Sequence, residues 1–339
     1  MKTVKLSINS PKAGLLRQTP EGDGVWGDYK FEINNDVKEC DFWVVYSKGQ
    51  KFDESCIVAP ENIILLTGEP ESIYHYAKGF VRQFPTVLTT RDDINASRLI
   101  KTQPAQPWWV GRKFGFLAAG NEAFNMSYED FLYSALHKPK MISVITSDKA
   151  FTKGHTQRIE FVQKLKAYFG DLIDVFGKGI NDFDDKWDIL KDYKYHVTLE
   201  NTSSDHYWTE KLADCYLAGC FPFYYGAPNL KEYFDESAFR LINIEDIEGS
   251  IRVIEDGIKN ELYEKSLDEL KAARYSILNK YNIFPFIAEL CDTLDVKQNK
   301  KKVKIKHEMS FFDLHKIPMF AKRFYCNSRS RKENRGLGS

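Results

Sequence analysis

The sequence predicts an α/β protein with two domains, each a parallel sheet flanked by helices. Three observations predict this class. The chain has 339 residues, long enough for about two domains, and 43% of them are apolar, enough for two cores. Short β-rich runs alternate with helical stretches, which is typical of parallel α/β layers. A stretch between Asn95 and Pro139, rich in Pro and Trp and without clean periodicity, separates the two halves.

The individual elements follow from this alternation. The predicted strands are Val4–Ile8, Phe42–Tyr46, Asn62–Thr67, Met141–Thr146, Leu172–Phe176, Tyr195–Glu200, Phe221–Tyr225 and Phe239–Ile242. The predicted helices are Ser72–Gln83, Thr156–Phe169, Thr209–Leu217, Asp246–Lys259 and Glu261–Tyr281.

These elements predict the domain boundaries. The first α/β unit ends near Thr90, and the second begins with the strand at Met141. We expect a first domain at 1–115, a connection at 116–139, a second domain at 140–280, a closing helix at 281–295 and a basic, aromatic tail at 296–339. Two such domains face each other across a cleft and hold ligands at the carboxyl ends of their strands. The last helices are expected to cross back to the first domain.

Composition narrows the class of protein. No apolar run reaches the roughly 20 residues of a membrane span. The start, Met1 to Leu6, alternates like a strand and lacks the apolar stretch of a signal peptide, which predicts a cytoplasmic protein. The six cysteines have neither zinc-site nor redox spacing, so we interpret them as buried apolar groups.

The segment around residue 200 carries the chemistry. The strand Tyr195–Glu200 alternates and runs into the polar loop Asn201–Asp205, and Thr209 then suits the N-cap of a helix. Free N–H groups at such a helix start bind anions, and Lys211 adds a positive charge. Glu210 suits a pair of sugar hydroxyls, because a carboxylate accepts two hydrogen bonds at once. Phosphate beside ribose indicates a nucleotide; the alternative is a capped surface helix with an ordinary Glu–Lys pair.

The next strand ends in Gly226, a glycine that would let a ligand approach the backbone closely. The whole run resembles the donor-domain signature of family 10 glycosyltransferases, the α-1,3/1,4-fucosyltransferases. The residues that carry the resemblance are Tyr193-Lys194-Tyr195, Glu200-Asn201-Thr202, Tyr207-Trp208-Thr209-Glu210-Lys211 and Pro222 to Asn229. The strong match covers about 45 residues, and weaker similarity extends over most of residues 60–295.

The resemblance implies a GT-B fold, GDP-fucose as the donor and inversion at the anomeric carbon. It implies donor contacts for Asn201, Tyr207 and Thr209, with Glu210 on the ribose. Glu200 either hydrogen-bonds the fucose or braces the loop.

Arg158 lies at a helix start after the strand at Met141, where family members have an Arg that binds the donor pyrophosphate. The resemblance therefore implies that Arg158 and Lys211 together neutralise the departing GDP. The family usually has Asn after the preceding Ser, whereas this chain has Asp148, which we leave outside the site. The alternative for Arg158 is a solvated helix residue.

Glu69 follows a strand in Thr67-Gly68-Glu69, which resembles the family element whose Glu is taken as the general base. Inversion by single displacement needs one base on the acceptor side. Glu71 is the fallback, and the alternative is that both glutamates are solvated beside a turn at Pro70.

No cofactor is required by this chemistry. The histidines lack metal-ligand spacing, although His155 and His206 fall in predicted donor loops. Asp182 and Asp184 flank Phe183 in an acidic stretch that we interpret as an exposed turn. We therefore expect no obligatory metal, with Mg²⁺ or Mn²⁺ at most a stimulator. Trp108-Trp109 fits either an acceptor sugar or core packing.

The tail from 296 to 339 contains 13 Lys/Arg against three acidic residues, although the whole chain has zero net charge. Basic residues interleaved with aromatic ones suit an anionic membrane or a nucleic acid. Bacterial relatives resemble this pattern and associate with membranes, so we favour an anionic membrane surface and no nucleic acid. That places the protein peripherally on the inner face of the cell membrane; the alternative is a disordered, solvated tail.

The predicted function is an inverting fucosyltransferase that transfers L-fucose from GDP-fucose to a glycan hydroxyl, in surface polysaccharide or glycan synthesis. An oligosaccharide or lipid-linked glycan is the expected acceptor, with GlcNAc in a LacNAc- or Lewis-type chain preferred and the choice of 1,3 or 1,4 linkage open. One alternative is a related enzyme that uses another nucleotide sugar. The other is a non-catalytic membrane-binding protein that acts through its tail.

Overall fold

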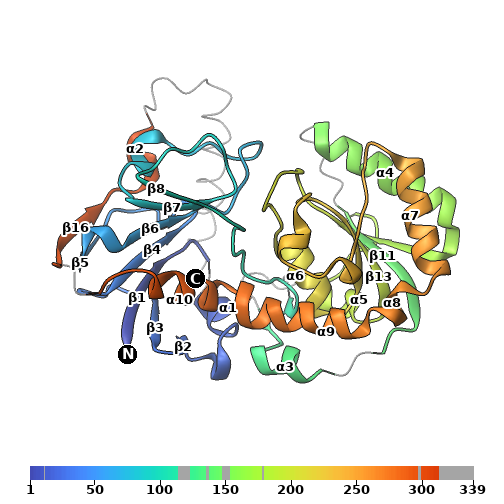
Figure 1. The fold of residues 1–339 in the computed structure, drawn as a ribbon, viewed down its shortest axis with the longest axis horizontal. Helices are drawn as coiled ribbons and strands as arrows, with labels where there is room; N and C mark the ends of the chain where they lie inside the picture. Colours follow the sequence, from blue (N-terminus) through green and yellow to red (C-terminus); the bar gives the residue numbers. More distant parts are fainter. Residues whose placement is uncertain are drawn as a thin grey trace, which may run out of the picture.

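The computed structural model describes residues 1–10, 12–113, 123–134, 137–146, 153–177, 179–296 and 299–312. It shows two α/β domains side by side, each built around its own sheet (Figure 1). The predicted α/β class with two Rossmann-like domains in a GT-B arrangement is confirmed. Residues 147–152 and 313–339, which include Ser147, Asp148 and most of the predicted tail, lie outside the described part of the chain.

The N-terminal sheet has the order β2-β3-β1-β4-β6-β7-β8, and all its pairs are parallel except β2 with β3. Its strands are β1 Lys2–Ser7, β2 Val25–Trp26, β3 Tyr29–Ile33, β4 Phe42–Tyr46, β6 Ile63–Leu66, β7 Thr86–Thr89 and β8 Arg98–Lys101. The central strand β4 reads Phe-Trp-Val-Val-Tyr and is buried along its whole length, as parallel strands covered on both faces are.

Two apolar clusters cover this sheet. One contains the closing helix α10, Ile283–Asp292, which crosses back from the C-terminal domain in the lower half of Figure 1. The other contains α2, Lys78–Val81, together with Ile305 and Phe311 from the end of the described chain. The short helix α1 spans Lys12–Leu16.

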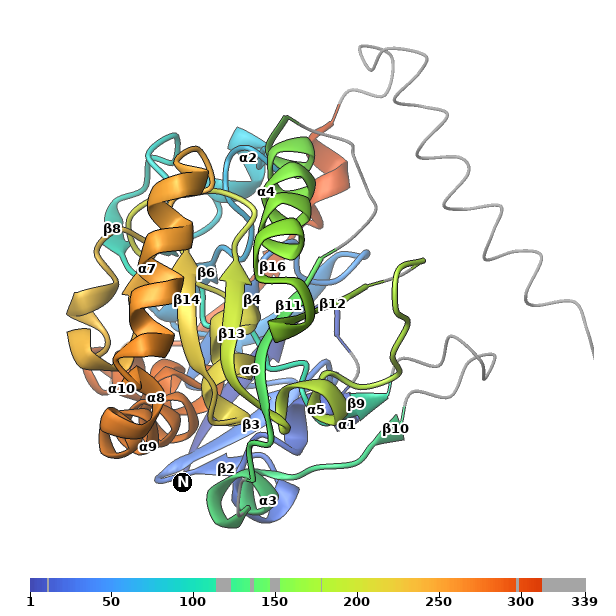
Figure 2. The ribbon, with the colours of Figure 1, turned by 90° about the vertical axis from the view of Figure 1, so that its right-hand side faces the viewer.

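The C-terminal sheet has the order β12-β11-β13-β14-β15 and is parallel throughout, with α4 and α7 on one side of it (Figure 2). Its strands are β11 Lys140–Ile145, β12 Ile173–Phe176, β13 Tyr193–Leu199, β14 Phe221–Tyr225 and β15 Arg240–Leu241. Its helices are α4 Lys153–Phe169, α5 Lys186–Leu190, α6 Glu210–Leu217, α7 Ile247–Lys259, α8 Leu262–Lys265 and α9 Leu267–Ser276, followed by a π-helical turn at Ile277–Tyr281.

The connection between the domains packs against the C-terminal core. It includes β9 Arg112–Lys113, its antiparallel partner β10 Ala123–Phe124, and α3 Tyr128–Tyr133. Trp108 is buried in the C-terminal apolar cluster, which settles the choice left open for it in favour of packing.

Three expectations about elements and boundaries are corrected. The helix predicted at Ser72–Gln83 is reduced to α2, because the preceding loop gives its backbone groups to tertiary partners described below. The first unit does not end near Thr90, since β8 adds a further strand to its sheet. The helix predicted at Glu261–Tyr281 breaks at Ser266 into α8 and α9.

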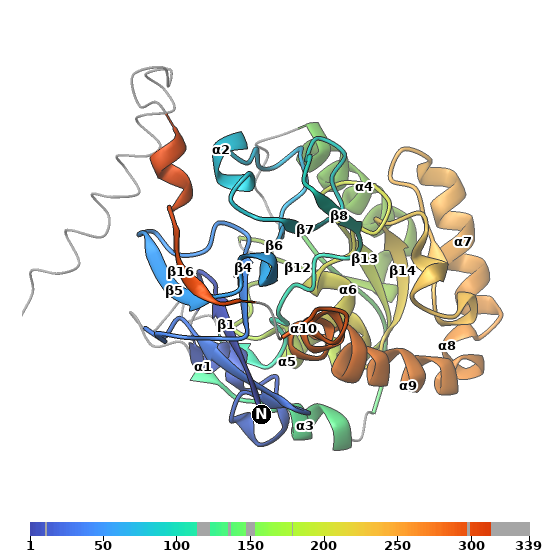
Figure 3. The same cartoon turned by 60° about the vertical axis from the view of Figure 1, so that its left-hand side comes forward.

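The predicted tail also differs from the structure. Residues Lys301–Ile305 form β16, which pairs antiparallel with β5, Glu54–Val58, at the side of the N-terminal domain (Figure 3). The lysines that suggested a free basic tail are partly neutralised there, since Lys300 pairs with Asp41 at 2.9 Å and Lys304 with Asp53 at 2.9 Å. Residues 299–312 therefore belong to the fold.

Candidate active site between the two domains

The predicted donor residues meet where β13 ends and α6 begins. β13 is almost wholly buried and ends at Leu199, so Glu200 and Asn201 lie at the carboxyl end of the sheet. Thr209 is the N-cap of α6, and its hydroxyl accepts the backbone N–H of Lys211 at 3.3 Å. The predicted strand, polar loop and capped helix are confirmed.

Glu200 is fully buried and ties this corner together. Its carboxylate accepts the backbone N–H of Thr209 at 2.8 Å and the Thr209 hydroxyl at 2.7 Å, and it lies 3.2 Å from the Lys211 ammonium. Burial raises the pKa of Glu200, against the opposing charge of Lys211. Of the two roles left open for Glu200, these contacts support the brace.

Gly226 makes room for that brace. A Cβ at this position would lie 2.0 Å from the Tyr224 hydroxyl and 2.6 Å from Cγ of Glu200. The expected reason for this glycine is the close approach of a ligand to the backbone. Its close neighbours are instead side chains of its own domain.

Two cations face the same strand end. The Lys211 ammonium lies between Glu200 and Glu210, at 3.2 Å and 3.5 Å. Burial disfavours its charge, but these two carboxylates outweigh burial, and the pKa of Lys211 lies above its usual value. Arg158, half-buried on α4, donates to Oδ1 of Asn201 at 2.9 Å and to the backbone oxygen of Glu200 at 3.4 Å.

Glu210 is the first residue of α6 and lies beside Lys211. Burial opposes its ionisation, but Lys211 and Lys186 outweigh burial, so the pKa of Glu210 lies below its usual value. A half-buried, ionised carboxylate beside a cation is suited to accept hydroxyl groups.

Glu69 reaches this environment from the other domain. It follows β6, is half-buried, and burial raises its pKa, with a further rise from the charge of Glu210 and opposing contributions from Lys211 and Lys48. The charges of Glu210 and Lys211, which belong to the other domain, therefore act on the Glu69 carboxylate. Glu71, the fallback, is exposed.

Comparisons with known proteins find a family match for the C-terminal domain, which contains the predicted donor residues. Residues 135–260 match the family model described as glycosyltransferase family 10 (fucosyltransferase), C-terminal part. Residues 135–260 form a family 10 glycosyltransferase domain. An α-(1,3)-fucosyltransferase of Helicobacter pylori is 31% identical over 104 residues, which are 28% of this chain and 21% of that protein. A fucosyltransferase-like protein of Arabidopsis thaliana is 36% identical over 66 residues, 19% of this chain and 13% of that protein.

The matches thus span about a fifth or less of the length of these relatives. Two solved structures align over more of the chain. One is an α1,3-fucosyltransferase with GDP, at 15% identity, covering 84% of this chain and 92% of that one with a TM-score of 0.46. The other is the lipopolysaccharide outer core galactosyltransferase WaaB, at 8% identity, covering 87% and 100% with a TM-score of 0.43.

The family 10 domain contains every predicted site residue except the base candidates. Within it, Tyr207 is almost fully buried, so its ring lies inside the corner rather than on its surface. His206, a candidate for phosphate contact, is held by the Tyr233 hydroxyl at 2.7 Å and by Asn229 at 3.0 Å. The side chain of His155 lies outside the described part of the structure. Asp182 and Asp184 are exposed, as the interpretation as a turn requires.

Three charged residues near the site were missed from the sequence. Lys48 follows β4, and its ammonium lies 3.6 Å from the centre of the Tyr74 ring. The charge of Lys186 lowers the pKa of Glu210, and its ammonium pairs at 2.6 Å with Asp214, which is fully buried on α6. The position of Lys48 directly after a buried strand was a usable signal. No pattern in the sequence indicated the pair of Lys186 and Asp214, which are 28 residues apart.

One group in the described residues could hold a metal ion. Ligand atoms of Glu71, His75 and Asp93 lie within 4.8 Å of one another, and all three residues are exposed. Arg91 already binds both oxygens of Asp93, at 2.8 Å and 2.5 Å, so a cation would have to displace an ion pair. The cluster lies beside the loop of Glu69, not among the donor residues.

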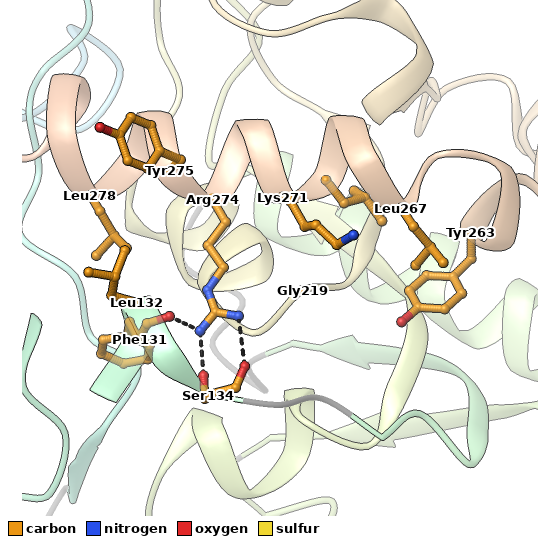
Figure 4. Close-up of a pocket in the computed structure, with 11 residues that line it drawn as sticks. Phe131, Leu132, Ser134, Gly219, Tyr263, Leu267, Lys271, Arg274, Tyr275 and Leu278 are labelled. Carbon is orange, nitrogen blue, oxygen red and sulfur yellow. Dashed lines mark hydrogen bonds between the residues drawn. The ribbon is translucent and has the colours of Figure 1, made fainter. Parts of the chain in front are cut away.

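A cavity of about 500 Å³ lies away from these residues, between α3 and α9 (Figure 4). Apolar side chains such as Leu267, Leu270 and Leu278 line it. Its central cation, Arg274, donates to the backbone oxygens of Phe131 and Ser134, so the guanidinium ties α3 to α9. None of the predicted donor residues lines this cavity.

Proposed function

We propose that this protein is an inverting fucosyltransferase that transfers L-fucose from GDP-fucose to a hydroxyl of a glycan acceptor. The observation that carries the proposal is the position of Glu69. A half-buried carboxylate of the N-terminal domain lies in the same electrostatic environment as Lys211 and Glu210 of the family 10 domain. A base on one domain and a nucleotide-sugar site on the other are what a single displacement requires.

In the proposed donor complex, Arg158 and Lys211 bind the pyrophosphate and Glu210 accepts the ribose hydroxyls. Asn201 orients the Arg158 guanidinium, to which it is already hydrogen-bonded. Thr209 presents the start of α6, while Glu200 fixes both Thr209 and Lys211. Tyr207 packs behind them.

In the proposed reaction, Glu69 takes the proton from an acceptor hydroxyl as its oxygen attacks the anomeric carbon. The bond between that carbon and the phosphate oxygen breaks, and its electron pair leaves with GDP. The two cations neutralise the charge that develops on the β-phosphate. The raised pKa of Glu69 strengthens it as a base.

Donor competition tests the proposal directly. The purified protein should release GDP from GDP-fucose, and an array of glycans should identify which acceptor increases that release. Faster turnover of GDP-mannose or of a UDP-sugar would establish the alternative, a related glycosyltransferase with another donor. Binding of GDP that is unaffected by Arg158→Ala and Lys211→Ala would show that the donor site lies elsewhere.

We further propose that residues 313–339 bring the protein to an anionic membrane, on the inner face predicted from the sequence. This segment has seven Lys/Arg against two acidic residues, with Phe320, Phe324 and Tyr325 among them. Among the described residues, no helix is both long and apolar enough to cross a bilayer. Co-sedimentation with anionic vesicles should weaken in a Lys322→Glu, Arg323→Glu double variant. Equal loss of binding to single-stranded RNA would favour a nucleic-acid partner instead.

A further inference from the structure

The described end of the chain reaches the loop that carries Glu69. After β16, residues Glu308–Phe311 form a short 3-10 turn that packs on α2. Phe311 approaches so closely that a Cβ on Gly79 would lie 2.3 Å from its ring. Figure 3 shows this red segment running along the outer side of the N-terminal domain from β16 toward α2.

Glu308 makes the connection. It is only 3% exposed, and it follows the basic stretch Lys300–Lys306. One carboxylate oxygen accepts the Tyr74 hydroxyl at 2.5 Å, and the other accepts the backbone N–H of Ala77, the N-cap residue of α2, at 3.0 Å. A buried carboxylate with two such bonds is a firm anchor, because leaving either donor unpaired would be costly.

The anchored loop in turn fixes Glu69. The buried Arg91 guanidinium donates to the backbone oxygens of both Tyr74 and Glu69. The Tyr76 hydroxyl accepts the backbone N–H of Gly68 at 3.4 Å and contacts the Ser47 hydroxyl at 3.2 Å. The residues from Gly68 to Ala77 are thus fastened at both ends and in the middle.

We propose that Glu308 is a positioning residue for the base, so that the segment 299–312 is needed for transfer and not only for localisation. The carboxylate of Glu308 sets Tyr74 and the start of α2, and Arg91 passes that order on to the backbone of Glu69. This inference rests on the proposed function for its kinetic consequence. Its structural part, the ordering of the loop 67–77, does not.

The test uses the full-length chain with Glu308→Ala, Tyr74→Phe and the control Glu39→Ala. The control removes an exposed partner of Lys300 at the start of the same segment, at 3.0 Å, without touching the loop. Because a displacement of about 1 Å can reduce rate on the order of 100-fold, kcat for transfer should fall by roughly 10- to 100-fold in Glu308→Ala. Tyr74→Phe should lose several-fold, and Glu308→Gln, which keeps one acceptor oxygen, should recover part of the loss.

Affinity for GDP separates positioning from unfolding, since the donor residues lie on the other domain. It should stay within about two-fold of wild type in all variants, a change near 0.4 kcal/mol or less. Amide hydrogen exchange of residues 67–77 should accelerate in Glu308→Ala while residues 199–217 stay protected. Wild-type kcat in a variant that binds GDP, or unchanged exchange of 67–77, would overturn the inference. If the wild-type protein transfers no fucose, faster exchange of 67–77 in Glu308→Ala would still support the structural part of the inference, whereas the proposed function would be refuted.

Discussion

The substitution Glu200→Gln distinguishes a brace from a sugar contact. Glutamine has nearly the volume of glutamate, so it leaves no cavity beside Gly226. Its remaining oxygen can still accept the backbone N–H of Thr209. The amide nitrogen, however, replaces the oxygen that lies 3.2 Å from the Lys211 ammonium, and two donors then face each other inside a buried corner.

The magnitude follows from the contacts that are lost. A hydrogen bond between charged partners contributes about 1.5–3 kcal/mol. Lys211 keeps Glu210 at 3.5 Å, so we expect a loss of about 2 kcal/mol in the free energy of unfolding. With a denaturant dependence of about 2 kcal/mol per molar urea, the midpoint should fall by roughly 1 M. Lys211 should also point less reliably at phosphate, which reduces GDP affinity by about ten-fold.

The assay is urea unfolding together with titration of GDP, with Glu236→Gln as the exposed control. The control should change neither quantity. If Glu200→Gln keeps wild-type stability and GDP affinity but raises the KM for GDP-fucose, Glu200 contacts the sugar and the brace is refuted.

Three further predictions concern the reacting groups. Glu69→Gln should reduce kcat by about 100-fold or more, whereas the kcat of Glu71→Gln should stay within about two-fold of wild type. Steady-state transfer rates of the two variants test this. A large loss in Glu71→Gln with little loss in Glu69→Gln would assign the base to Glu71. Arg158→Lys keeps the charge but loses the planar fork, so GDP affinity measured by calorimetry should fall about ten-fold; an unchanged affinity would mean that Arg158 only orders Asn201. The charge of Lys48 lowers the pKa of Glu69 and so opposes the effect of burial. Lys48→Gln should therefore raise the pKa of Glu69 further and move the acid limb of the pH–rate profile to higher pH. If the acid limb does not move, the group that titrates there is not Glu69.

The donor-binding part of the site could be predicted because the sequence patterns that indicate it lie close together in the chain. A period-two strand, a polar loop and a Thr N-cap lie within about 20 residues of one another, and each has its own physical signature. The contact between Glu200 and Thr209, which supports one of the two roles left open for Glu200, also spans only nine positions. Here local preference and tertiary structure agree, so the prediction needed no knowledge of the rest of the chain.

The loop at 69–77 shows where such reasoning fails. Ser72–Gln83 has residues compatible with a helix, yet only Lys78–Val81 is helical. Backbone groups of Glu69, Tyr74 and Ala77 are taken by Arg91 and by Glu308, which is 231 positions from Ala77. These tertiary hydrogen bonds outweigh the small helix preference of residues 72–77, and no local sequence pattern predicts them.

For residues 299–312, the prediction of a basic tail is wrong for a related reason. Charge and aromatic content alone do not distinguish a solvated tail from an edge strand, because lysines are common on both. What decides the matter is the acidic partner of each lysine, and Asp41 and Asp53 are about 250 positions earlier in the sequence. Glu308, an acid among lysines, was the one sign in this stretch of a specific buried contact.

The distance between Glu69 and the donor residues depends on hydrogen bonds made by residues 106–110, which lie outside the site. Asp214, buried on α6, accepts the backbone N–H groups of Trp109 and Val110 at 2.9 Å and 3.0 Å. Three residues before Trp109, the Gln106 amide donates at 2.7 Å to the backbone oxygen of Gly68. The helix that begins with the donor residues is therefore linked through residues 106–110 to the backbone that carries Glu69. Because Trp108 and Val110 are packed in the C-terminal core, a rotation of one domain against the other would strain the bond between Gln106 and Gly68, and this bond therefore restrains the distance between the reacting groups.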